Sequence, residues 1–224
     1  MRHHPDAVML FAAGFGTRMG ALTAATPKPL LHVADRPLID HALDLTHGLH
    51  VVANTHYLPD QLEAHLAPKG VTLSHEPRIL ETGGGLRAAL PLLGEGPVFT
   101  LNSDAIWTGA NPLTALAQAW DPDRMDALLM LIPRESARGH TGKGDFLPDT
   151  QGRLSRGPGL IYSGAQIVKT DLLHEVEDDV FSLNILWDRM MDAGRLYGIA
   201  HTGAWCDVGR PDGIAVAEAM LAND

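Results

Sequence analysis

Short apolar runs alternate along the chain with amphipathic segments. Apolar runs of this length, ending at glycine or polar residues, are typical of buried strands, and they occupy 8–12, 49–53, 71–74, 97–101 and 127–132. Helical spacing follows several of them: Leu58, Leu62 and Leu66 lie four residues apart, on one stripe of a helix. The alternation predicts an α/β fold with a mixed, mostly parallel sheet and helices on both faces.

The remaining segments are predicted from the same patterns. Further helices are expected at 37–46, through 86–90, at 112–120, at 181–193 with Ser182 as its cap, and at 211–221. Strands are expected at 196–200 and at 160–168, where Gly164 indicates a bulge or a close approach of a ligand. The three glycines at 83–85 are interpreted as a loop, and so is the stretch 202–211.

Three candidate features each follow a predicted strand: the glycine loop after residue 12, the glycines at 83–85, and Asp104. In open α/β sheets, ligands bind outside the carboxyl ends of the strands. We therefore expect these three features to lie together at one edge of the sheet.

Length and charge narrow the class of protein. A chain of 224 residues predicts a single domain over 1–224. The net charge of −10 argues against nucleic-acid binding. The single cysteine, Cys206, excludes an internal disulfide. Neither a membrane span nor a signal peptide is evident, so a cytoplasmic location is expected.

The first glycine loop has the chemistry of a polyphosphate site. Gly14 and Gly16 allow the backbone to approach a ligand closely, and Arg18 and Lys28 add two cations. The dinucleotide fingerprint does not fit, because its third glycine would have to stand one residue before Gly20. A Walker A loop does not fit either, since no Gly-Lys-Ser/Thr follows.

The segments Phe11–Met19 (FAAGFGTRM) and Pro27–Leu30 (PKPL) together resemble the signature of the sugar-1-phosphate nucleotidyltransferases. The resemblance extends over most of the chain, to Gly209. It implies a nucleotide-binding half at about 1–135, and a half at about 136–210 that binds the sugar and carries the second metal ligand. It implies that a nucleoside triphosphate and a sugar 1-phosphate react, with Mg²⁺ as cofactor, to give a nucleotide sugar and pyrophosphate. The quaternary structure it implies is a monomer or a small homo-oligomer.

Two aspartates are candidate metal ligands on this resemblance. Asp104 stands in Asn-Ser-Asp and Asp207 in Trp-Cys-Asp-Val-Gly, both similar to metal-binding motifs of the family. Carboxylates are the ligands that Mg²⁺ prefers. The alternatives are a helix cap for Asp104 and a simple turn residue for Asp207.

The resemblance also assigns roles around the nucleotide. Arg18 is expected on the leaving phosphates, and Lys28 on the α-phosphate or the sugar phosphate. Contacts with the rest of the nucleotide are expected from Ala12, Ala13, Gly14, Gly16, Thr17, Glu81, Gly83 and Gly84. Gly83 and Gly84 are expected to leave room for a flat base and ribose.

The sugar side has weaker signals. Candidates are Asn54, Gly144, Asp145 and Gly164, each of which could equally serve a structural turn. Gly20 stands where relatives often carry a cation, and either Arg156 or Lys169 is expected to supply the missing charge to the sugar phosphate.

Within the family, the segments ETGGG, KGDF and WCDVG resemble the branch of uridylyltransferases that act on N-acetylmuramate 1-phosphate in cell-wall recycling. The segment NTHYLPDQLEAHL would also suit short mannose-1-phosphate guanylyltransferases. Two further classes remain open: a non-catalytic nucleotide-sugar sensor, and a dinucleotide-dependent oxidoreductase. The oxidoreductase would need an acidic residue where the chain has Asn54.

Overall fold

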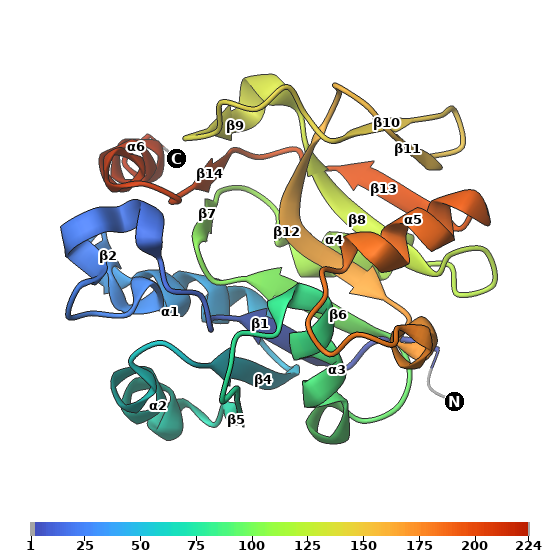
Figure 1. Cartoon of the computed structure of the whole chain (residues 1–224). Helices are drawn as coiled ribbons and strands as arrows, with labels where there is room; N and C mark the ends of the chain where they lie inside the picture. Colours follow the sequence, from blue (N-terminus) through green and yellow to red (C-terminus); the bar gives the residue numbers. More distant parts are fainter. Residues whose placement is uncertain (1–2, 224) are drawn as a thin grey trace.

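A seven-stranded sheet with the order β13-β8-β12-β6-β1-β4-β5 forms the centre of the computed structural model (Figure 1). Its strands are β1 (Ala7–Phe11), β4 (His50–Thr55), β5 (Thr72–His75), β6 (Val98–Asn102), β8 (Ala127–Ile132), β12 (Ile161–Val168) and β13 (Leu196–Ala200). Only β12 runs antiparallel to its neighbours, β6 and β8, among the described strands of this sheet. The prediction of a mostly parallel sheet is confirmed.

Helices cover both faces of the sheet, because side chains of each strand point alternately to the two sides. Helices α3 (Glu81–Leu93) and α5 (Asn184–Asp192) pack on one face together with Met9 of β1. Helices α1 (Leu38–Leu43), α2 (Pro59–Leu66) and α4 (Pro112–Ala119) pack on the other face with Val8 and Leu10. Both layers bury aliphatic and aromatic side chains against the sheet, and this packing holds the strand ends in fixed positions.

Smaller elements surround the carboxyl edge of the sheet. A three-stranded sheet contains β7 (Ala105–Trp107), β14 (Trp205–Asp207) and β9 (Ala137–Arg138), and β10 (Phe146–Pro148) forms a hairpin with β11 (Leu154–Arg156). The last helix, α6 (Pro211–Leu221), lies beside the hairpin of β2 (His32–Val33) and β3 (Arg36–Pro37), although these segments are far apart in sequence (Figure 1). The 3-10 helices are η1 (Thr17–Thr23), η2 (Lys28–Leu30), η3 (Asp44–Thr46), η4 (Ala67–Lys69), η5 (Arg134–Ser136) and η6 (Asp171–Glu175).

Three local predictions are wrong. The glycines at 83–85 lie in the first turns of α3 rather than in a loop. The expected loop 202–211 contains β14, which pairs with β7 and β9. Helix α5 begins at Asn184, so Ser182 precedes it, although the Ser182 hydroxyl still accepts a hydrogen bond of 3.3 Å from the Asn184 amide.

The structure describes residues 3–223, so the predicted domain limits at Met1 and Asp224 lie outside it. The first two residues of the amino-terminal stretch, in which no signal peptide is evident, also lie outside it. Within that range, no helix is both long and apolar enough to cross a membrane.

Candidate active site

The loop after β1 forms the floor of a cavity of about 410 Å³ at the carboxyl edge of the sheet. The predicted nucleotide-binding residues Ala12, Ala13, Gly14, Gly16 and Thr17 line it, together with Arg18, Lys28, Asn54, Glu81 and Asp104. The expected convergence of the first glycine loop and Asp104 is therefore confirmed. The volume is in the range of sites for small organic ligands.

Gly16 is required for the position of Lys28. Its φ of 64° is left-handed, and an added Cβ would lie 2.9 Å from both the Lys28 Cβ and the Thr23 Cγ2. The close approach that the sequence predicts is thus made by the chain itself, which packs η2 against the loop. Pro27 and Pro29 fix the backbone on either side of Lys28. A buried lysine is thereby aimed at the cavity on a stiff support.

Lys28 and Asp104 form an ion pair, with 2.6 Å between Nζ and Oδ2. Asp104 follows β6, and its carbonyl accepts a hydrogen bond from the amide of Val208, just after β14. This backbone contact brings Asp207 to the same place. An ideal Cβ on Gly209 would lie 3.0 Å from both carboxylate oxygens of Asp207 and 3.1 Å from Arg18 Nη1. Arg18, Lys28 and the two aspartates thus form one charged cluster.

The two carboxylates repel each other. Burial raises the pKa of Asp207 above its ordinary value, and the nearby charge of Asp104 raises it further, against the opposing effects of Lys28 and Arg18. When a carboxyl group is costly to ionise in the free protein, a bound cation makes its ionised form favourable. The pair therefore has the electrostatics of a cation site.

Mg²⁺ fits this donor set if substrate completes its coordination. The ion usually keeps water and is held by one or two carboxylates plus substrate phosphates. Among residues 3–223, no group of three or more His, Cys, Asp or Glu side chains could hold a metal ion. Asp104 lines the first cavity and Asp207 lies next to it, beside the lining residue Gly209. Such a pair matches a metal shared with a phosphate ligand, not a structural metal.

Asn54, a predicted sugar-side residue, lines the first cavity. Its Oδ1 accepts a 2.7 Å hydrogen bond from the Ala12 amide, and its Nδ2 donates one of 2.7 Å to Glu76. Glu76 in turn accepts from the Leu80 amide at 3.1 Å. Asn54 thus links β4 to the first loop and to the segment before α3. Because the Ala12 amide is already bonded, that amide is not a free donor for a ligand.

The glycines of α3 also need correction. The amides of Gly83 and Gly84 both donate to the Phe181 carbonyl. An added Cβ on Gly83 would lie 2.3 Å from the Phe181 ring, and one on Gly84 would lie 2.3 Å from the Asp179 carbonyl. Their missing side chains therefore make room for the segment before α5, not for a base. Glu81 and Thr82 line the cavity in their place.

A second cavity, of about 290 Å³, adjoins the first, since Phe11, Thr82 and Asn102 line both. Asp145, a predicted sugar-side residue, lines this second cavity, and its Oδ2 accepts a hydrogen bond of 2.8 Å from the Tyr162 amide. The other lining residues are Phe146, Arg156, Tyr162, Ser182, Leu183, Asn184 and Trp187.

Gly144 and Gly164 lie outside the lining of both cavities. An added Cβ on Gly144 would overlap Gly159, and one on Gly164 would lie 2.6 Å from the Asn102 side chain. The close approach at each glycine is therefore to another part of the chain. Gly164 does mark a bulge, because the register between β12 and β8 shifts there.

Of the two alternatives for an additional cation, Arg156 lines the second cavity and Lys169 lines neither of the two. Lys169 follows β12, whose end pairs with the amino-terminal start of β6, so it lies at the opposite edge of the sheet. Its ammonium contacts Asp126 at 2.9 Å and the Pro122 carbonyl at 2.8 Å. Lys169 is a structural residue that helps to hold Asp126, whose second oxygen contacts Arg195.

Sequence reasoning missed several residues at the site, among them Glu76, Asn102, Trp187 and His140. Glu76 and Asn102 stand at strand ends, and that position was a usable signal. Trp187 follows from no local pattern, because its place depends on how α5 packs. His140 lies near Asp207, and its Nε2 is buried without a hydrogen-bond partner among the described residues.

Comparisons with known proteins identify the family of the chain. Residues 8–142 match the model of the MobA-like NTP transferase domain. An N-acetylmuramate alpha-1-phosphate uridylyltransferase of Caulobacter vibrioides is 42% identical, and the match covers 100% of both chains. One from Neisseria meningitidis is 36% identical over 95% of this chain and 96% of its own.

Structural similarity supports the fold independently. HddC from Yersinia pseudotuberculosis, in a crystal structure complexed with GMP-PN, superposes with a TM-score of 0.75 at 17% identity, covering 96% of this chain and 99% of its own. The chain is a member of the nucleotidyltransferase family with a MobA-like NTP transferase domain, which includes the N-acetylmuramate alpha-1-phosphate uridylyltransferases.

Proposed function

We propose that the protein transfers a uridylyl group from UTP to N-acetylmuramate 1-phosphate, giving UDP-N-acetylmuramate and pyrophosphate. The observation that carries this proposal is the cluster of Arg18, Lys28, Asp104 and Asp207 at the first cavity, with a second cavity beside it. The extent of the similarity to two uridylyltransferases supports the choice of substrates.

In this reaction an oxygen of the sugar phosphate attacks the α-phosphorus of UTP. The bond from the α-phosphorus to the bridging oxygen breaks, and pyrophosphate leaves with the electron pair. Both reactants are anions, so catalysis consists mainly of positioning and charge neutralisation. Lys28 would approach the reacting phosphates from its support on η2, and Arg18 would neutralise the leaving phosphates.

Mg²⁺ would be held by Asp104 and Asp207, and it would supply positive charge to the phosphate oxygens. The raised pKa of Asp207 supports this assignment, because the cost of its buried charge is relieved by a cation. We place the enzyme in the cytoplasm, in the recycling of cell-wall sugars.

The nucleotide would occupy the first cavity and the sugar the second. The first cavity contains the glycine loop and both cations, Arg18 and Lys28. The second contains the polar and aromatic side chains Asp145, Asn184 and Trp187, a combination that suits a sugar ring. Asn102 and Thr82 line both cavities, at the boundary between the two substrates.

The test is release of pyrophosphate with Mg²⁺, for UTP, GTP, dTTP, CTP and ATP against the 1-phosphates of N-acetylmuramate, N-acetylglucosamine, glucose and mannose. We expect turnover with UTP and N-acetylmuramate 1-phosphate. Turnover only with GTP and mannose 1-phosphate would keep the reaction type and replace the substrates. No turnover from folded protein with any pair would overturn the proposal in favour of a nucleotide-sugar sensor.

A further inference from the structure

Arg156 has a prepared position in the second cavity. It ends β11, and its guanidinium lies over the ring of Phe146, 4.8 Å from the centroid, and 5.7 Å from that of Trp187. Both aromatic residues line the same cavity. Within the part of the chain that the structure describes, Arg156 is the only lysine or arginine that lines it.

One edge of the guanidinium is held by α5. Nη2 donates to Asn184 Oδ1 at 2.8 Å and to Asp188 Oδ1 at 2.9 Å, and Nε is 3.3 Å from the same Asp188 oxygen. No acceptor from residues 3–223 is found on Nη1. The Arg156 and Asp188 side chains are 41% and 61% exposed, and pairs this open contribute little to stability. The contacts orient the guanidinium and leave Nη1 available to a ligand.

N-acetylmuramate differs from N-acetylglucosamine by a lactyl ether, which carries a carboxylate. Arginine suits a carboxylate because its guanidinium is always charged, and neither N–H group of Arg156 Nη1 is bonded within residues 3–223, so both can donate to it. We infer that Arg156 binds this carboxylate and thereby selects N-acetylmuramate 1-phosphate over sugar 1-phosphates without an acidic substituent. The inference rests on the proposed function and assigns the substrate specificity to one residue.

The position of Arg156 argues against a contact with the reacting phosphate. Lys28, Arg18 and Asp104 line only the first cavity, whereas Arg156 lines only the second. The phosphate has to meet the α-phosphorus beside Lys28, so the sugar ring and its substituents lie between it and Arg156. Arg156 can therefore balance a charge on the sugar that lies too far from Lys28 and Arg18 to be neutralised by them.

The experiment compares Arg156→Gln with wild type, using UTP and either N-acetylmuramate 1-phosphate or N-acetylglucosamine 1-phosphate. We expect KM for the muramate substrate to rise by about ten- to a hundredfold, as for the loss of a charged hydrogen-bonded pair. KM for the glucosamine substrate should change less than about twofold. Arg156→Lys keeps the charge but not the fixed Nη1 donor, so it should recover part of the muramate KM.

Calorimetry of the binding of UDP-N-acetylmuramate and UDP-N-acetylglucosamine, the two products, compares the two sugars without turnover. Wild type should bind UDP-N-acetylmuramate more tightly than UDP-N-acetylglucosamine, and Arg156→Gln should remove most of that preference. The matched control is Arg189→Gln, in the same helix as Asp188, because Arg189 pairs with Glu175 and lines neither cavity. It should keep the wild-type preference.

Three outcomes would overturn the inference. Equal losses with both sugars would assign Arg156 to the phosphate or to folding. An unchanged preference would mean that another group recognises the carboxylate, and a wild type without any preference would mean that none does. Failure of the proposed function is a separate result: wild type would then not turn over UTP and N-acetylmuramate 1-phosphate at all.

Discussion

The Lys28 ammonium lies 2.6 Å from Asp104 Oδ2, and the two side chains are 11% and 28% exposed. The pair joins the first loop to the end of β6, which are 76 residues apart in sequence. In the absence of substrate, the Lys28 ammonium balances the charge of Asp104, which otherwise repels the carboxylate of Asp207. The same lysine is therefore poised between a carboxylate and the phosphates that the cavity is proposed to bind.

Lys28→Gln should lower kcat/KM by about 10²- to 10³-fold, the usual cost of removing one donor that stabilises charge in a transition state. Pyrophosphate release measures it. Lys69→Gln is a suitable control, because Lys69 pairs with Asp40 and lines only a different surface hollow. A Lys28 variant that kept wild-type turnover would remove the residue from the proposed mechanism.

Asp207→Asn should separate stability from activity. Burial and the charge of Asp104 raise the pKa of Asp207, so its ionised form is unfavourable in the free folded protein. We expect the variant to have an equal or higher Tm without Mg²⁺, and turnover reduced at least about 100-fold. Thermal unfolding and pyrophosphate release measure the two effects.

Asp104→Asn should also lose turnover, but its Lys28 would be left without a charged partner, so no gain in Tm is expected. The surface carboxylate Asp44, paired with Arg36, gives a control variant, Asp44→Asn, with wild-type behaviour. Wild-type rates in both Asp104→Asn and Asp207→Asn would contradict the assignment of the metal ligands.

Much of the fold follows from local patterns in the sequence. Apolar runs such as Ala127–Ile132, all of whose residues are buried, mark central strands without ambiguity. The carboxyl-edge rule then places the first loop and Asp104 together, because parallel strands end on the same side. These predictions needed no knowledge of long-range contacts.

The errors arise where a long-range contact decides the role of a residue. A glycine run is typical of a loop, yet Gly83 and Gly84 lie in α3 because Phe181, almost 100 positions later, packs against them. Asn54 is at the expected strand end, but its partners are Ala12 and Glu76. Lys169 and Arg156 carry the same charge, so the sequence does not tell which of them lies at the cavity. The pairing of β12 with β6 places Lys169 at the opposite edge of the sheet.

The two kinds of glycine give a direct comparison. Gly83→Ala should destabilise the protein by about 1–3 kcal/mol, because the new Cβ would lie 2.3 Å from the Phe181 ring and the gain in helix propensity does not offset such overpacking. Gly14→Ala should change stability by less than about 0.5 kcal/mol, since no heavy atom lies within 4 Å of its Cβ. Urea unfolding measures both.

Gly14→Ala should impair activity more than Gly83→Ala does, the reverse of their effects on stability. Gly14 lines the first cavity, so its Cβ would meet the nucleotide and raise KM for UTP. Gly83 lines neither cavity, and the fraction of Gly83→Ala that remains folded should bind UTP normally. A Gly14→Ala variant with unchanged KM would place the phosphates elsewhere.

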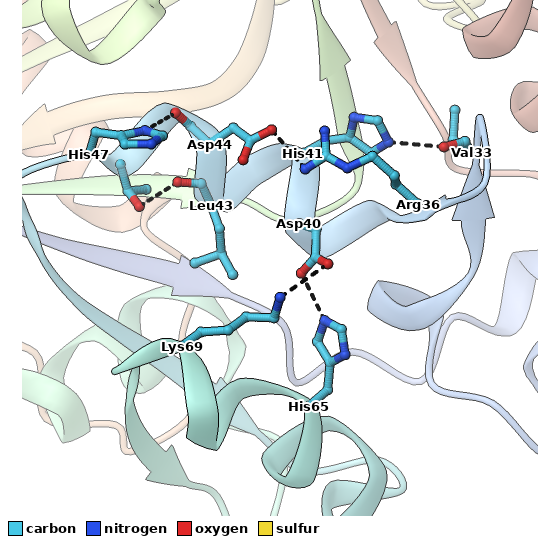
Figure 2. A network of polar contacts seen from close by, with 10 residues as sticks. Val33, Arg36, Asp40, His41, Leu43, Asp44, His47, His65 and Lys69 are labelled. Carbon is cyan, nitrogen blue, oxygen red and sulfur yellow. Dashed lines mark hydrogen bonds and ion pairs between the residues drawn. The ribbon is translucent and has the colours of Figure 1, made fainter.

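Away from the site, Asp40 joins α1 to α2 and η4 (Figure 2). Figure 2 shows its carboxylate facing both His65 and Lys69, with distances of 2.8 Å to His65 Nε2 and 3.3 Å to Lys69 Nζ. Burial alone would raise the pKa of Asp40, but these two partners outweigh it and hold the pKa below its ordinary value of 3.8. The folded state therefore binds the proton less readily than the unfolded state.

This sign determines the pH dependence of stability. A carboxyl with a depressed pKa in the folded state contributes stability above its unfolded pKa, and the contribution is lost as pH falls through the folded value. Asp40→Asn should therefore cost about 1–3 kcal/mol at pH 7, as expected for hydrogen bonds to a charged group. The difference from wild type should shrink as the pH falls below 3.8. Urea unfolding at pH 7 and near pH 3 measures it, and an equal difference at both values would show that Asp40 acts through packing rather than charge.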